Sequence, residues 1–445
     1  MTKSSALARW QQFHANHPGV DFVWVLFTTY IGTNLVRVVP RPAFERLLET
    51  NQGISVPSVI LHLLPRDNIA DGGTLTGSFR LQPDLRSLSP SLHPNKAVVM
   101  ASWTDRGKTP LDECARTKLD ALAHSIEQKS NCSLLVGFEL EFTLLRQRTL
   151  PDGRVTYEPA NTDHAWCSMT RDDELLLGLL EEAVLALQSL GIMVQQFHAE
   201  LAPGQWEFVL PPTSPLRAVD ALVLARQTVM KLAIKHGYRA TLHPRLSPTQ
   251  PGTGAHVHIS LNSASGAADA STAQSFFAGI LDHFPALSAF TLPQEISYGR
   301  VAGGISSGGE YVCWGWENRE TILRRIASER FEVKMMDGLA NPYLGLCALL
   351  GAGVDGVRRG LVLSAGPCLG EPGRMSEQER AELGITTKMP AGLVESLECL
   401  EADEGLREVL GDALVSTYLA VKRGEMKVVQ QMGPEEQRVW FISRY

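Results

Sequence analysis

Two glutamates in the middle of an apolar segment constrain this chain more than any other feature. Residues 134–145, LLVGFELEFTLL, are rich in Leu, Val and Phe on both faces, which is typical of a buried strand. Glu139 and Glu141 interrupt the segment. Residues i and i+2 of a strand point to the same face, so these carboxylates project together, roughly 7 Å apart. Either this face is open to solvent, or positive groups lie beside it, because buried carboxylates lose hydration and repel each other.

Two further segments repeat this pattern of polar side chains at period two. Residues 196–210, QFHAELAPGQWEFVL, contain His198, Glu200 and Glu207, and the Pro-Gly turn predicts a hairpin that brings the two glutamates together. Residues 252–261, GTGAHVHISL, place two histidines, His256 and His258, on one strand face. A buried histidine is often only a hydrogen-bonded core residue, so this pair alone leaves a structural role and metal binding both open.

A fourth segment completes the set. Residues 330–344, RFEVKMMDGLANPYL, place Arg330, Glu332 and Lys334 on one face of another strand. Five carboxylates and one imidazole suit Mg²⁺ or Mn²⁺ better than zinc, which favours Cys and His. A site this acidic can hold two cations, which points to phosphate chemistry. The predicted metal ligands are Glu139, Glu141, Glu200, Glu207, His256 and Glu332.

A further segment supplies the arginines that a phosphate site needs. Residues 314–325, WGWENRETILRR, supply Arg319, Arg324 and Arg325. We interpret Arg319 and Arg324 as counter-charge for a triphosphate; the alternative is a charged surface on which the arginines pair with neighbouring glutamates. The sequence contains no Walker-type glycine-rich loop and no dinucleotide fingerprint. A nucleotide would therefore bind to a fold that is neither P-loop nor Rossmann.

Composition limits the remaining classes. The chain has 445 residues, 44% hydrophobic and 20% charged, with a net charge of −7. Mixed charges of this kind predict no nucleic-acid partner and no membrane partner. Seven scattered cysteines without metal-type pairs indicate a reducing compartment, so we expect a cytoplasmic location. The first nineteen residues have no long apolar core and do not resemble a secretory leader.

The order of elements predicts an α+β chain of two domains. Strands are expected at 21–32, 33–40, 58–64 and 95–103, with an extended loop at 66–95, and these form a β-rich N-terminal domain over residues 1–105. Residues 106–445 form the larger domain, in which strands alternate with helices at 111–129, 174–191 and 215–237. Residues 262–274 and 366–392 are expected to be loops, and the rest of the last eighty residues to be helical.

Five motifs in this order resemble the glutamine synthetase family. They are GFELEF, HAELAPGQWE, GTGAHVHISL, ENRETILR and FEVKMMDGLANPYLGL, and the resemblance runs from about residue 22 to the end. It implies a small β-grasp-like domain and a large domain whose antiparallel sheet curves into half a barrel, flanked by helices. It also implies a homo-oligomeric ring in which each active site lies between two subunits.

The resemblance also implies roles for individual residues. Glu141, Glu200 and Glu207 would hold one Mg²⁺ or Mn²⁺, and Glu139, His256 and Glu332 would hold another, near the phosphates of ATP. The remaining residues would bind ATP and the amino-acid substrate: Arg324, Arg330, His258 and Ser260 on the nucleotide side, Arg300 and Arg319 around the substrate carboxylate and the phosphoryl group, and Gly252 through its backbone.

Three positions depart from the family pattern: two missing acids bear on the amine, and Lys334 bears on the carboxylate substrate. Family members that use ammonia carry an acid in the small domain, but the corresponding stretch here, TLTGSFRLQPDL, has none at that place, and Asp84 is expected to be structural. The flap, RVAGGISSGGEYVCW, is glycine-rich, and only Glu310 could replace the usual flap glutamate, after a shift of the alignment. Lys334 stands where the family has arginine, which keeps the charge and loses the bidentate geometry.

These departures favour a ligase with an altered amine site. The preferred hypothesis is an ATP-dependent ligase that activates a carboxylate, that of glutamate first, and joins it to a substituted amine. Ordinary glutamine synthesis from glutamate and ammonia is the alternative. A non-catalytic regulatory or assembly protein on the same fold is the second alternative, although all six metal ligands are present.

Overall fold

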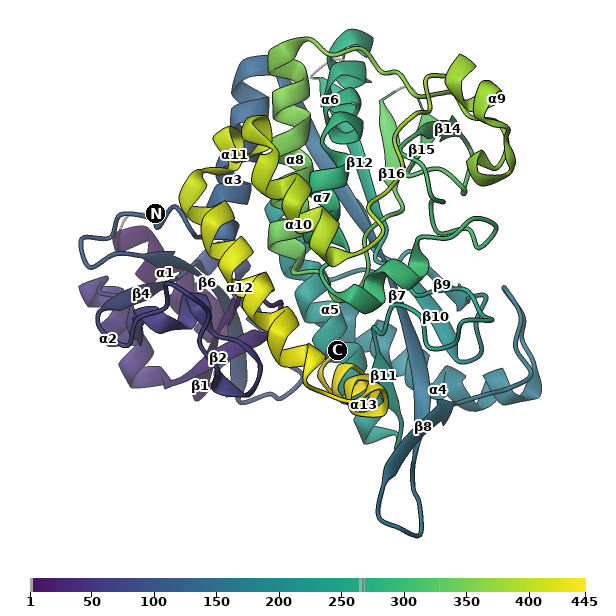
Figure 1. Cartoon of the computed structure of the whole chain (residues 1–445). Helices are drawn as coiled ribbons and strands as arrows, with labels where there is room; N and C mark the ends of the chain where they lie inside the picture. The colour runs from purple at the N-terminus through teal and green to yellow at the C-terminus, as the bar shows by residue number, and fades with distance from the viewer. Residues whose placement is uncertain (1–2, 264–265, 268, 328) are drawn as a thin grey trace.

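A computed structural model describes residues 3–263, 266–267, 269–327 and 329–445. It contains two sheets and an extensive set of helices (Figure 1). The α+β class predicted from the sequence is confirmed. The division into domains 1–105 and 106–445 stays a prediction. Within the described residues, no helix is both long and apolar enough to cross a membrane.

The smaller sheet is β-grasp-like. Its strands, in the order β2-β1-β6-β4-β3, are β2 (Asn34–Pro40), β1 (Phe22–Thr28), β6 (Lys96–Thr104), β4 (Ser78–Pro83) and β3 (Ile54–Pro57), and β5 (Ser89–Pro90) pairs with β6. The central pair, β1 and β6, is parallel, and β1 forms an antiparallel hairpin with β2. This sheet forms one side of the molecule in Figure 1, coloured purple.

Two helices of this region were not expected. These are α1 (Lys3–Asn16) and α2 (Arg41–Thr50), which meet where Trp10 packs edge-to-face on Phe44 at 5.0 Å between ring centroids. Trp10 is buried, and Leu7 and Phe13 pack against the core on either side of it in the sequence. That spacing of three residues is helical, so α1 had a readable signal.

Two sequence predictions in this region were wrong. Residues 58–64 do not form a strand, because Ser58–His62 is a 3₁₀ helix in which the consecutive residues Ile60 and Leu61 are both buried. The loop expected at 66–95 contains β4, whose Leu81 is completely buried between β3 and β6. Phe79 and Leu81 alternate with polar residues, so β4 had a readable signal that the turn-forming residues around it outnumbered.

The larger sheet carries the four segments singled out in the sequence. Its order is β14-β15-β16-β12-β7-β10-β9, and the strands are β14 (Trp314–Trp316), β15 (Leu323–Ala327), β16 (Arg330–Val333), β12 (Val257–Ser263), β7 (Cys132–Thr149), β10 (Gln205–Val209) and β9 (Gln196–Ala199). Three short strands attach to its margins, β8 (Val155–Pro159) and β11 (Arg239–Thr241) on β7, and β13 (Gly266–Ala267) on β12. Pairing is antiparallel throughout except between β14 and β15, and the sheet curls as the predicted half-barrel.

Helices cover one face of this sheet and leave the other to the site (Figure 1). Helices α3 (Ala115–Ser130) and α5 (Pro215–Lys235) pack on β7, and α8 (Pro342–Arg359) packs on both of them. The other helices are α4 (Arg171–Ser189), α6 (Ala270–Asp282), α7 (Phe284–Thr291), α9 (Glu377–Glu382), α10 (Leu393–Ala402), α11 (Glu404–Leu410), α12 (Asp412–Gln430) and α13 (Pro434–Arg444).

The two predicted loops of the larger domain differ from expectation. Residues 366–392 include α9, and Cys368 and Ile385 are buried against Tyr311 and Cys313, so this segment is partly core. The predicted loop at 262–274 lies partly outside the described residues; within them, β12 runs to Ser263 and α6 begins at Ala270.

Candidate functional site

Strand register aligns the acidic residues in two rows across the sheet. In one row, His198 of β9 lies opposite Glu207 of β10, and Glu207 lies opposite Glu141 of β7. In the other row, His258 of β12 lies opposite Glu332 of β16, and Glu332 lies opposite Arg324 of β15. Directly opposed residues share a face, so the side chains of each row lie together. Each row joins segments that are far apart in the sequence.

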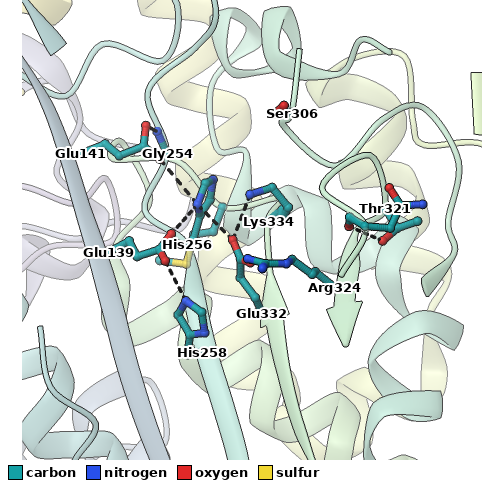
Figure 2. Close-up of polar contacts among 12 residues, drawn as sticks. Glu139, Glu141, Gly254, His256, His258, Ser306, Thr321, Arg324, Glu332 and Lys334 are labelled. Atoms are coloured by element: carbon teal, nitrogen blue, oxygen red, sulfur yellow. Dashed lines mark hydrogen bonds and ion pairs between the residues drawn. The ribbon is translucent and has the colours of Figure 1, made fainter. Parts of the chain in front are cut away.

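The first cluster is centred on Glu139 (Figure 2). Its carboxylate contacts both histidines of β12, with 2.8 Å from Oε2 to His256 Nδ1 and 2.8 Å from Oε1 to His258 Nε2. His256 Nδ1 also lies 3.5 Å from Glu141 and 3.3 Å from Glu332. Two groups of three ligand atoms result, Glu139–Glu141–His256 and Glu139–His258–Glu332, each with its atoms within 4.8 Å of one another.

Hydrogen bonding orients His256 for a cation. Its Nε2 lies 3.4 Å from the guanidinium of Arg300, which can only donate, so Nε2 accepts. In the neutral ring, Nδ1 then carries the proton and donates to Glu139. A cation bound at Nδ1 would take the place of this proton; the proton of the neutral ring would then lie on Nε2, which requires Arg300 to turn away from that nitrogen.

The second cluster lies on the β9–β10 hairpin. His198 Nε2 is 3.5 Å from Glu207, and its Nδ1 is 3.6 Å from Glu200, so the three residues form another group within 4.8 Å. The sequence prediction placed Glu141 with Glu200 and Glu207. The structure places His198 with these two glutamates and groups Glu141 with Glu139 and His256. His198 was noted in the sequence but was not among the predicted ligands, although it stands two residues before Glu200 on the same face.

The clusters differ in electrostatic balance. Burial raises the pKa of Glu200 to about 7, and the neighbouring carboxylates of Glu141 and Glu207 add to the rise. Burial opposes the ionisation of Glu332 as well, but the charges of Lys334, His256 and His258 together outweigh it and lower the pKa of Glu332 to about 2. Burial and Lys334 lower the pKa of His256, but Glu141 and Glu139 outweigh them and raise it. The β9–β10 side therefore holds more negative charge than its own cations neutralise, which is the condition that attracts a metal ion.

Two hydrogen-bond donors, one from a side chain and one from the backbone, hold Glu141 in place; the sequence prediction missed both. Its Oε2 accepts from Gln205 Nε2 at 2.7 Å and from the Gly254 N–H at 2.8 Å. Gln205 also donates to the carbonyl of Gly252 at 3.1 Å. A side chain at Gly252 would meet the carbonyl of Pro244 at 2.6 Å and Arg300 at 3.0 Å, so only glycine fits at this predicted substrate position.

Most of the cationic side chains predicted for the site contact the first cluster. Lys334 Nζ lies 2.9 Å from Glu332, and Arg324 lies 3.0 Å from the other oxygen of the same carboxylate and also pairs with Glu317. Arg330 approaches His258 Nδ1 at 3.3 Å, and Ser260 is opposite Arg330 in the β12–β16 register. Arg300 is 1% exposed and donates to the Met336 carbonyl at 3.1 Å.

Arg319 and Glu310 are not drawn into the clusters. Both side chains are exposed, and Glu310 accepts from the Gly303 N–H at 3.4 Å. A different acid holds the flap: Glu320 accepts from the Gly304 N–H at 2.8 Å and from the Ser306 N–H at 2.7 Å. Ser307, also on the flap, is buried and donates to the Arg300 carbonyl.

Asp84 lies far from any such role. It pairs with Arg86 and, at 2.9 Å, with Arg116, which also contacts Asp220 of α5 at 2.7 Å. Its pKa is lowered to about 2: burial opposes ionisation, but the hydrogen bonds from Arg86 and the charge of Arg116 prevail. These ion pairs tie the smaller sheet to α3 and α5, as expected of a structural residue.

Comparison with known proteins agrees with this geometry. The model of the glutamine synthetase catalytic domain matches residues 112–439. The chain therefore belongs to the glutamine synthetase family, whose members are ATP-dependent ligases that form C–N bonds.

Curated relatives carry several names. Protein fluG of Emericella nidulans is 41% identical over 438 residues, which cover 98% of this chain but only 50% of that protein. The glutamine synthetase of Methanocaldococcus jannaschii is 32% identical over 80% of this chain and 82% of its own length. The gamma-glutamylpolyamine synthetase GlnA3 of Streptomyces coelicolor is 30% identical over 90% of this chain and 89% of its own.

A solved structure supports the fold. The ADP complex of GmaS has a TM-score of 0.81 and 24% identity, and the match covers 96% of this chain and 98% of the other.

Proposed function

We propose that this chain is an ATP-dependent carboxylate–amine ligase that activates the γ-carboxylate of glutamate and joins it to a substituted amine. The observation that carries the proposal is the convergence of Glu139, His256 and Glu332 beside Arg324 and Lys334, with Glu200 and Glu207 close by. Arrays of carboxylates flanked by guanidinium and ammonium groups suit a polyphosphate with divalent cations.

The donor set fits two hard cations. Glu139, His256 and Glu332 would hold one Mg²⁺ or Mn²⁺, and Glu141, Glu200 and Glu207 the other, with His198 as a further ligand that the hairpin brings to the second site. Carboxylate oxygens are the ligands these ions prefer. When bound, the cations neutralise the charge of the transferring phosphoryl oxygens.

The chain's own residues would position the substrates and stabilise charge. A free carboxylate resists attack, because the nucleophile adds charge to an anion, and transfer of the γ-phosphoryl group of ATP turns it into an acyl phosphate with a good leaving group. Arg324, Arg330, His258 and Ser260 would hold the nucleotide, Arg300 and Arg319 the carboxylate and the phosphoryl oxygens, and Gly252 the amino acid through its backbone. Preorganised donors of this kind lower the barrier where charge develops.

The amine side supports a substituted amine over ammonia. The small-domain stretch at 74–85 offers no acid except Asp84, which is engaged with Arg86 and Arg116. On the flap, Glu310 would be the remaining acid for deprotonating the amine. GlnA3, named a gamma-glutamylpolyamine synthetase, is a relative over most of its length. The relative named glutamine synthetase keeps ordinary glutamine synthesis as the alternative.

Assembly and location are further parts of the proposal. We expect a homo-oligomeric ring with active sites between subunits and a cytoplasmic location. Because the chain spans half of protein fluG, the activity of a longer protein built on this chain is also a proposal.

The test is ADP release coupled to NADH oxidation, with glutamate, Mg²⁺ and ATP, and with the amine varied from ammonia to alkylamines and polyamines. Greater kcat/KM with a substituted amine than with ammonia supports the proposal, and mass spectrometry of the amide identifies the product. Preference for ammonia supports ordinary glutamine synthesis. A chain that binds ATP and releases no ADP with a wide panel of acids and amines would be a non-catalytic member of the family.

A further inference from the structure

A buried polar network anchors the segment 161–170, here called the strap, to the β9–β10 hairpin. Asp173, at the start of α4, is fully buried and accepts from Asn161 Nδ2 at 2.5 Å and from the Thr170 N–H at 2.8 Å. Ser168 Oγ also donates to this carboxylate, at 3.2 Å. One carboxylate thus fastens both ends of the strap.

The same network holds the turn that carries Glu200. His164 Nε2 lies 2.6 Å from the carbonyl of Glu200, and Asn161 accepts from the Gly204 N–H at 2.6 Å. The side chain of His164 is completely buried, and its ring packs edge-to-face on Trp206. These hydrogen bonds join the strap to the hairpin through side chains that include His164 and Asp173, both completely buried.

The outer side of the strap presents apolar surface next to the second acidic cluster. The Trp166 ring meets the ring of His198 edge-to-face, with 6.4 Å between centroids, and the Cys167 N–H donates to the Ala199 carbonyl at 2.9 Å. Trp166 is nevertheless 58% exposed. Two further exposed apolar residues lie close in the sequence, Met169 on the strap and Leu201 directly after Glu200.

An exposed tryptophan beside a histidine of the second cluster favours one kind of ligand. A protonated amine is attracted by the face of an indole ring. A hydrocarbon substituent on that amine adds to the binding free energy by covering the ring. Ammonia has no such substituent and draws no benefit from the apolar surface.

We infer that Trp166 is a specificity-determining residue that contacts the hydrocarbon part of the amine substrate, and that this substrate is a primary amine with an apolar alkyl or aryl substituent. The inference rests on the proposed function. It differs from it by naming the residue that selects the amine and the class of amine selected.

The test compares wild-type protein with Trp166→Ala and Trp166→Phe in the full chain loaded with Mg²⁺, ATP and glutamate. The amines are ammonia, methylamine, butylamine and benzylamine. The ratio of kcat/KM for butylamine to that for ammonia is expected to fall at least tenfold in Trp166→Ala and to be largely restored in Trp166→Phe, because the apolar contact is lost in one and kept in the other. Leu185→Ala, at a comparably exposed apolar position on α4, serves as the control and leaves the ratio unchanged.

Binding separates this inference from the proposed function. Calorimetric titration of butylamine into protein with Mg²⁺ and a non-hydrolysable ATP analogue is expected to show at least tenfold weaker affinity in Trp166→Ala. If no amine supports turnover but this difference remains, the proposed function fails, and only the contact of Trp166 with a bound amine is retained. An unchanged ratio and unchanged affinity, or a loss of assembly in Trp166→Ala seen by light scattering, overturns the inference, because Trp166 would then be a surface or subunit-contact residue.

Discussion

The two sides of the site are built by different means. On the first-cluster side, Glu332, Glu141 and His256 are 1%, 4% and 6% exposed, and each charge is opposed by another within the chain. Trp166 and Glu310, the two residues proposed to act on the amine, are exposed. Buried charges must be paired by the fold itself, whereas exposed groups gain their partners from a substrate or a neighbouring subunit. Specificity for the amine can therefore change without disturbing the phosphate side.

The largest loss of stability is expected when a charge is removed from the buried side, which tests whether its charges are paired by the fold. Glu332→Ala leaves Lys334 buried without its partner and deprives Arg324 of one of two carboxylates. We expect a loss of about 3–5 kcal/mol of unfolding free energy in metal-free buffer, measured by urea denaturation, together with loss of ADP release.

The matched control is Glu371→Ala, which removes an ion pair with Arg374 in which both side chains are far more exposed, 34% and 79%. It is expected to cost less than about 1 kcal/mol. Equal losses in the two variants would contradict the contrast between buried and exposed charges.

The next largest effect is expected from the strap anchor. Asp173→Ala leaves the buried donors of Asn161 and Thr170 without an acceptor and is expected to destabilise the chain by about 2–3 kcal/mol. The same change loosens the turn at Glu200, so Mn²⁺ affinity in calorimetric titration should fall about 10- to 100-fold. Asp152→Ala, which removes an exposed pair with Arg154 on the β7–β8 hairpin, is the control. Unchanged Mn²⁺ affinity in Asp173→Ala would show that the strap does not position the site.

A pH series tests the unbalanced charge at Glu200. Burial, Glu141 and Glu207 raise its pKa from 4.5 to about 7 in the folded chain. A raised folded-state pKa contributes stability that is fully present below pH 4.5 and is lost as the pH rises through 7. Metal-free Glu200→Gln has no such group, so its unfolding free energy relative to wild type should rise by about 3 kcal/mol between pH 4.5 and pH 8.

Magnesium should reverse that change. Excess Mg²⁺ is expected to stabilise wild type at pH 8, because the bound ion supplies positive charge beside the ionised Glu200. It should stabilise Glu200→Gln much less, because that variant lacks the carboxylate. If the difference in unfolding free energy between wild type and Glu200→Gln does not change with pH, the assignment of unbalanced charge to this side is refuted.

The smallest effect on stability is expected at the flap. Glu310→Gln alters an exposed side chain and should change the unfolding free energy by less than about 0.5 kcal/mol. If Glu310 deprotonates the amine, kcat should nevertheless fall by about a hundredfold, and its acidic pH limb should be lost. Glu382→Gln on α9 is the exposed control. Wild-type kcat in Glu310→Gln would remove Glu310 from the proposed site.

Sequence reasoning found most of the acidic site because strand periodicity is local. Glu139 with Glu141, and His256 with His258, each stand two residues apart in apolar surroundings, so their common face follows from backbone geometry alone. It missed Gln205 and Gly254 as donors to Glu141, because nothing local distinguishes a glutamine or a glycine that faces a carboxylate from one that faces solvent.

The grouping of ligands was beyond local reasoning. His198 is grouped with Glu200 and Glu207, while Glu141 is grouped with Glu139 and His256. This grouping depends on the register of β9, β10, β7 and β12. A shift by one residue in any of these pairs would turn the side chains to the opposite face.

The amino-acid sequence by itself determined the α+β class, the strands that carry carboxylates and imidazoles, and the family to which the chain belongs. Only the tertiary structure decided that Lys334 is engaged by Glu332, that Glu320 holds the flap while Glu310 stays exposed, and that Trp166 lies against His198 at the edge of the site. The physical reason is range. Periodicity acts over a few residues of one strand, whereas the partner and the exposure of each of these side chains also depend on strand register and on the path of the loops that bring segments together.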